Sequence, residues 1–128
     1  MSIFTSELIG TALLILFGNG VVANVVLKHT KGNNSGWIVI TFGWAMAVFI
    51  GVFVSSKVSG AHLNPAVTIA LAYLGKVQLS LVPQYIGGQF LGAMLGQLFV
   101  YFAYRQHYFA TDDTGGKLAT FSTAPAMR

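Results

Sequence analysis

Three long stretches of this 128-residue chain are almost free of charge, and they constrain its fold more than any other feature. Residues 3–27 carry one charged side chain, while residues 37–56 and 79–104 carry none. A helix needs about 20 consecutive apolar residues to cross the hydrocarbon core of a bilayer, and each stretch is long enough. Only 8% of all residues are charged, against about 25% in soluble domains. The sequence therefore predicts an all-α membrane protein with three transmembrane helices.

Two of these stretches carry small residues at every fourth position. On a helix such residues form one smooth stripe, along which a neighbouring membrane helix can approach closely. We therefore expect both stripes to be packing surfaces. Their members are Gly43, Ala47, Gly51 and Ser55 in the second stretch, and Gly88, Gly92 and Gly96 in the third.

The segment between the second and third stretches, residues 57–75, has a different character. Asn64 is of a type preferred as a helix N-cap, and Pro65 suits the first position of a helix. Because a proline pushes the preceding residue out of the helical region, we expect Asn64 to cap a helix that Pro65 opens. Continuing through residue 74, this helix would cover roughly 15 Å, about half of a hydrocarbon core. Irregular backbone at that depth must be buried in protein or line a watery cavity, so we predict a re-entrant half-helix.

Residues 59–68 of this segment read SGAHLNPAVT. This stretch resembles the first Asn-Pro-Ala signature of the aquaporin and aquaglyceroporin family, the major intrinsic proteins, and is most similar to its bacterial glycerol uptake facilitators. The resemblance covers the whole chain but only the N-terminal half of the family's fold. It implies that residues 1–104 form half of an inverted-repeat channel. Residues 105–128 would then be an extracellular loop leading to a second half.

The resemblance also implies a pore with one polar wall. In the family, carbonyl groups of the non-helical residues before the cap accept hydrogen bonds from water or polyol hydroxyls. If the Asn64 side-chain oxygen caps the half-helix, its NH₂ group remains as a donor, and the helix N-terminus adds partial positive charge. Both features disfavour cations and interrupt a proton-conducting chain of water. The residues expected to line this pore are Trp44, Gly60, Ala61, His62, Leu63, Asn64, Pro65 and Ala66.

Each of these assignments has a simpler alternative. Trp44 aligns with an aromatic residue of the selectivity filter, which is tryptophan in glycerol facilitators and usually phenylalanine in water-selective members. It is otherwise a packing or interfacial tryptophan. Glu7 aligns with a buried glutamate that braces the loop by accepting backbone N–H bonds, and is otherwise a carboxylate that snorkels or favours the helix dipole. His62 either faces the pore or is a satisfied structural histidine, and Asn64 is otherwise only a cap.

Several functional classes do not fit the sequence. No histidine or acid stands beside a nucleophile as a catalytic triad needs, the spacing of a metal site is absent, and there is no cysteine. The basic residues are scattered singly, so the net charge of +4 does not indicate nucleic-acid binding. We therefore expect a passive channel for glycerol, other small polyols and water, with no cofactor and no metal. The alternatives are a water-selective channel and a non-conducting membrane protein of the same fold.

Orientation and assembly are expectations from the resemblance. With three spans, five basic residues lie on the side opposite the N-terminus, namely Lys28, Lys31, Arg105, Lys117 and Arg128. Lys57 and Lys76 share the N-terminal side, so the positive-inside rule alone would place the N-terminus outside. We follow the family, which places it in the cytoplasm, because this count covers half a fold. The family also implies a homotetramer in the cell membrane, here a bacterial plasma membrane, with one pore in each subunit.

Overall fold

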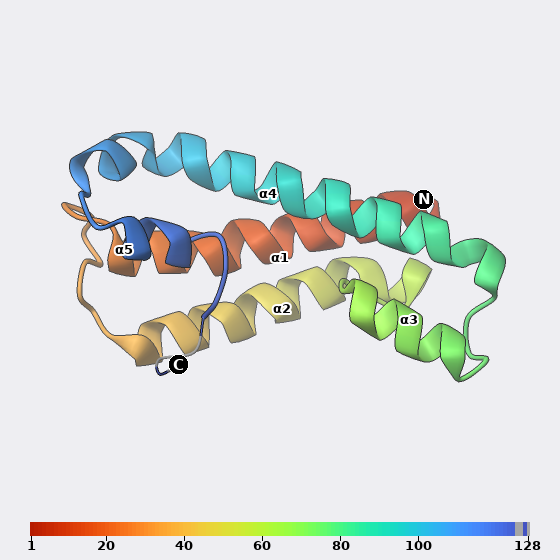
Figure 1. The fold of residues 1–128 in the computed structure, drawn as a ribbon. Helices are drawn as coiled ribbons and strands as arrows, with labels where there is room; N and C mark the ends of the chain where they lie inside the picture. Colours follow the sequence, from red (N-terminus) through yellow and green to blue (C-terminus); the bar gives the residue numbers. More distant parts are fainter. Residues whose placement is uncertain (125–126, 128) are drawn as a thin grey trace.

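The computed structural model describes residues 1–124 and 127, and these residues form helices joined by short loops, without a strand (Figure 1). The helices are α1 (Ile3–Val26), α2 (Trp37–Ser59), α3 (Pro65–Tyr73), the single 3₁₀ turn η1 (Leu79–Leu81), α4 (Val82–Ala110) and α5 (Thr114–Ala119). Within this part of the chain the all-α prediction is confirmed. Arg128, one of the five basic residues in the charge count, lies outside the described residues.

The helix α1 lies at the centre, between α2 and α4 (Figure 1). Most contacts between helices join α1 to one of these two neighbours. At one end of the bundle α3 packs against α4, and at the other end α5 contacts α1 (Figure 1). Three segments are long and apolar enough to cross a membrane: Ile3–Val26, Trp37–Ser59 and Leu79–Ala110. The bundle therefore has the three expected spans and one short helix between the second and third.

Small residues let α1 approach both neighbours closely. A Cβ atom added at Gly88 would lie 2.5 Å from the carbonyl oxygen of Phe4, and one added at Gly51 would lie 3.0 Å from that of Gly10. Real Cβ atoms essentially never show the first distance, and the second is tighter than nine in ten real Cβ contacts. The predicted stripes on α2 and α4 thus pack against α1, which makes the helix pairs tight but carries no information about a substrate.

Two helix boundaries and one loop differ from the sequence prediction. The second helix continues to Ser59 instead of residue 56, and α4 continues to Ala110 instead of residue 104. Hydropathy marks where the apolar stretch ends, whereas the backbone hydrogen bonds of a helix continue through polar residues such as Lys57 and Arg105. The segment 105–128, predicted to be a loop, contains α5, because the Asp113 side chain caps this helix by accepting a hydrogen bond from the Gly115 N–H.

Candidate functional site: the re-entrant loop and its half-helix

The loop between α2 and α3 has an unusual backbone. Gly60 has φ 78°, and two residues with side chains, Ala61 and Leu63, have φ 54° and 51°. A left-handed conformation costs a residue with a Cβ atom roughly 1–2 kcal/mol. This backbone therefore persists only because its surroundings stabilise it, which is common at functional sites.

The half-helix α3 begins where the sequence predicts. Asn64 is extended (φ −155°), its side-chain Oδ1 accepts a hydrogen bond from the Ala66 N–H at 2.8 Å, and Pro65 is the first helical residue. The NH₂ group of Asn64 makes no hydrogen bond within the described residues, and the residue is exposed. Asn64 therefore offers a free donor at the N-terminus of a helix, where the partial charge is positive.

The carboxylate of Glu7 holds the loop from the side of α1. Glu7 is 0% exposed. Its Oε1 accepts from the Ser59 hydroxyl at 2.5 Å and the His62 N–H at 3.0 Å, and its Oε2 accepts from the Leu63 N–H at 2.7 Å. A buried carboxylate needs such partners, and hydrogen bonds to a charged group are the strong ones. Glu7 thus fixes two consecutive backbone N–H groups directly before Asn64.

Two residues of α4 that sequence analysis did not select, Gln89 and Tyr85, complete this arrangement. Gln89 of α4 donates through Nε2 to Glu7 Oε2 at 2.8 Å and to the Thr68 hydroxyl at 2.9 Å. Tyr85 donates its hydroxyl to the Ser59 carbonyl at 2.7 Å, and its ring stacks on the His62 imidazole. Polar side chains inside a predicted span were the available signal, because such residues are seldom found there without a role.

Trp44 lies toward the end of the bundle that carries α5. Its ring covers Gly18 of α1, where an added Cβ atom would come within 2.5 Å of the indole. Trp44 also lines a pocket of about 570 Å³ with residues of α1, α2, α5 and the segment after α5. Asn64 lines a different pocket, of about 270 Å³. The structure therefore brings Glu7 and residues 59–66 together, and it places Trp44 farther along the bundle.

Both pockets nevertheless lie along the same face of α1. Thr11 and Ile15 line the pocket that contains Asn64, while Val22 and Val26 line the pocket that contains Trp44. Residues spaced by four and seven positions share one face of a helix. Trp44, Asn64 and the loop are thus arranged beside one continuous strip of α1.

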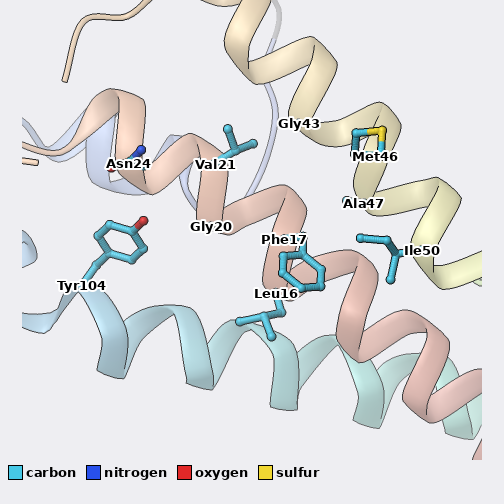
Figure 2. Close-up of a pocket in the computed structure, with 10 residues that line it drawn as sticks. All are labelled: Leu16, Phe17, Gly20, Val21, Asn24, Gly43, Met46, Ala47, Ile50 and Tyr104. Carbon is cyan, nitrogen blue, oxygen red and sulfur yellow. The ribbon is translucent and has the colours of Figure 1, made fainter. Parts of the chain in front are cut away.

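The opposite face of α1 carries a separate groove of about 500 Å³ (Figure 2). Phe17, Gly20 and Asn24 of α1 line it, together with residues of α2 and Tyr104 of α4, whose ring points toward Asn24 in Figure 2. None of the predicted pore residues lies in this groove. The two faces of α1 therefore differ, and the candidate site belongs to the face with the re-entrant loop.

This fold and site define a helical membrane protein that is built around a re-entrant half-helix. A sequence profile for the major intrinsic proteins matches residues 1–127, and the chain belongs to that family.

Relatives with assigned names agree with this family. The chain is 56% identical over its full length to a probable glycerol uptake facilitator protein of Thermotoga maritima, of which it covers 55%. It is 57% identical over 95% of its length to a glycerol uptake facilitator protein of Streptococcus pneumoniae, of which it covers 52%. For the protein of the same name in Bacillus subtilis, the identity is 47% and the coverage 46% of that protein.

A solved structure is also similar. The aquaglyceroporin from Plasmodium falciparum superimposes with a TM-score of 0.77 at 41% identity, over 84% of this chain and 43% of that one. The expected aquaporin fold is thereby confirmed. The chain spans about half the length of the curated relatives and of the solved structure that it matches.

Proposed function

We propose that this chain, together with a second half of the same fold, forms a passive channel for glycerol, other small polyols and water. The observation that carries the proposal is a set of hydrogen-bonding groups in the loop and at its cap that have no partner among the described residues. The NH₂ group of Asn64 has no hydrogen-bond partner among the described residues. The carbonyl groups of the four residues before it, Gly60, Ala61, His62 and Leu63, also accept no hydrogen bond there. Such groups need partners, and a hydroxyl supplies both a donor and an acceptor.

The arrangement suits polyols better than ions. A row of acceptors followed by one donor matches a chain of hydroxyl groups, each of which accepts and donates a hydrogen bond. The exposed donor and the N-terminal end of α3 disfavour cations at the same position. Relatives at 47–57% identity are named glycerol uptake facilitators, which supports glycerol as the substrate. The mechanism would be diffusion along hydrogen-bonding groups, without a cofactor.

The proposed partner is a second half-fold inserted with inverted topology. One half-helix reaches about the midplane, so an equivalent half-helix would complete the pore from the other side. Each subunit of a homotetramer would hold one such pore. The N-terminus would face the cytoplasm, and residues 105–124 and 127 would belong to a segment on the outer side that leads into the second half.

Vesicle swelling tests this function. Protein isolated from its native membrane is reconstituted, and the vesicles are placed in iso-osmotic glycerol. Faster glycerol entry than in empty vesicles is expected. Water flux without glycerol flux would favour a water-selective channel, and no flux above that of empty vesicles would favour a non-conducting membrane protein. Trp44→Phe separates the first two further, because a smaller aromatic at this position is expected to lower the ratio of glycerol to water flux.

A further inference from the structure

The ring of His62 contacts the hydroxyl of Thr68, which is in turn hydrogen-bonded by Gln89. Thr68 and Gln89 are 0% and 1% exposed. Gln89 Nε2 lies 2.8 Å from Glu7 Oε2 and 2.9 Å from Thr68 Oγ1, and Thr68 Oγ1 lies 3.0 Å from Nδ1 of the His62 ring. These contacts form a continuous path from the carboxylate to the imidazole.

The carboxylate fixes the orientation of the Gln89 amide. Reversing the amide would place its oxygen 2.8 Å from Glu7 Oε2, so that two acceptors would face each other. It would also leave the NH₂ group on the side where the amide oxygen now has no partner among the described residues. Gln89 therefore uses both of its N–H hydrogens, one on Glu7 and one on Thr68. Thr68 Oγ1 accepts the second of these.

The single hydroxyl hydrogen of Thr68 then has two possible acceptors. The Asn64 carbonyl lies at 3.3 Å and already accepts the Thr68 backbone N–H at 3.1 Å. The His62 Nδ1 lies closer, at 3.0 Å, and no other hydrogen bond within the described residues uses it. In the alternative, Nδ1–H would donate to Thr68 Oγ1 and the Thr68 hydroxyl would turn to the more distant Asn64 carbonyl, so the shorter contact favours donation to Nδ1. An Nδ1 that accepts a hydrogen bond carries no proton, so the proton of the neutral ring is on Nε2.

The ring itself is fixed in orientation. It stacks on Tyr85 with ring centroids 4.2 Å apart and an interplanar angle of 16°. Tyr85 is in turn tied to the loop through its hydrogen bond to the Ser59 carbonyl. With Nδ1 directed at Thr68, the Nε2 edge is directed away from it, and it makes no hydrogen bond within the described residues.

We propose that Thr68 and Gln89 are positioning residues that hold His62 as its Nε2–H tautomer, which gives the loop an imidazole donor next to its acceptor carbonyls. That this donor binds the oxygen of a passing polyol or water rests on the proposed function. The tautomer itself does not, because it is inferred from the contacts around Nδ1 alone. The polar wall would then carry two side-chain donors, the Nε2–H of His62 and the NH₂ group of Asn64, two residues apart.

Nitrogen-15 NMR of histidine-labelled protein in lipid bilayers tests the assignment, because the two neutral tautomers and the imidazolium have different chemical shifts. The measurement is made at about pH 8.5, where ordinary histidines are neutral. His107 supplies an internal contrast. Its Nδ1 lies 2.9 Å from the Lys28 carbonyl, which only accepts, so His107 is expected to be the Nδ1–H tautomer. One spectrum should therefore contain both tautomers, with Nε2–H at His62.

Two variants separate positioning by Thr68 from an intrinsic preference of the ring. Thr68→Ser keeps the hydroxyl and should keep the Nε2–H signal. Thr68→Val removes the donor at nearly constant shape and should give a mixture of tautomers at His62, with the His107 signal unchanged. A predominant Nδ1–H or imidazolium signal at His62 in the unaltered protein would overturn the proposal, as would a Thr68→Val spectrum identical to it. If Thr68→Val does not fold, Thr68→Ala, which also removes the hydroxyl, is measured in its place and decides by the same two outcomes. No outcome depends on glycerol flux.

Discussion

Replacing Glu7 with glutamine should loosen the re-entrant loop. The carboxylate accepts four hydrogen bonds, from the side chains of Ser59 and Gln89 and from the N–H groups of His62 and Leu63. A glutamine has one acceptor oxygen. Its best orientation keeps that oxygen toward Leu63 and Gln89, and turns its NH₂ group toward Ser59, whose hydroxyl can rotate and accept. The His62 N–H cannot rotate, and it loses its partner.

The magnitude follows from these contacts. An unpaired buried N–H costs about 1–3 kcal/mol, and the two remaining bonds lose the extra strength that a charged acceptor provides. Because net values for hydrogen bonds to charged groups already include desolvation, we expect the free energy of unfolding to fall by about 2–4 kcal/mol. Thermal unfolding in detergent measures the loss. Hydrogen exchange locates it: relative to the unaltered protein, exchange should accelerate most at the His62 amide, which loses its acceptor, and less at the Leu63 amide, whose acceptor loses its charge.

The matched control is Asp112→Asn, which makes the same change of carboxylate to amide at an exposed position. Asp112 is 95% exposed at its side chain and pairs with Lys28 at 3.8 Å. Exposed pairs contribute little, so no measurable change is expected there. If Glu7→Gln unfolds at the same temperature as the unaltered protein, with unchanged exchange at His62 and Leu63, the carboxylate is not the brace of the loop.

Two further predictions concern packing and selectivity. Gly88→Ala should destabilise the bundle by about 1–3 kcal/mol, because the new Cβ atom would overlap the Phe4 carbonyl. The adjacent Gly87→Ala is the control and should be tolerated, because its nearest neighbour is the Phe4 side chain at 3.4 Å. Equal unfolding temperatures for the two variants would contradict the claim that Gly88 is needed for close packing. Trp44→Ala should widen the pore and weaken discrimination between glycerol and larger polyols in vesicle swelling. An unchanged ratio of rates would show that Trp44 only packs over Gly18.

The sequence predicts the half-helix well because its signals are local. Asn64 as cap and Pro65 as first helical residue depend on the preferences of two neighbouring residues, and the structure places both as expected. The length of α4 depends on something else. Arg105 and His107 end the apolar stretch and so end the predicted span, yet neither residue breaks a helix, and α4 continues past both.

The network behind the loop was beyond the reach of the sequence. Glu7 and Gln89 are far apart in the chain, and only the packing of α1 against α4 brings the carboxylate and the amide within 2.8 Å. The resemblance to the aquaporins indicated Glu7, but no local pattern indicated that Gln89 would contact Thr68 or that Thr68 would contact His62. The left-handed backbone of Ala61 and Leu63 was equally unpredictable, because both residues disfavour that conformation and adopt it in this tertiary setting.

The most direct test of the account is glycerol flux through Asn64→Asp. An aspartate still caps α3 through a side-chain oxygen, so the protein should fold, with an unfolding temperature close to that of the unaltered protein. It replaces the free NH₂ donor with a negative charge. We expect glycerol flux in reconstituted vesicles to fall by about tenfold or more, which corresponds to about 1.4 kcal/mol, and proton leak to rise. A folded Asn64→Asp variant with unchanged glycerol flux and unchanged proton leak would contradict the claim that Asn64 lines the conducting path.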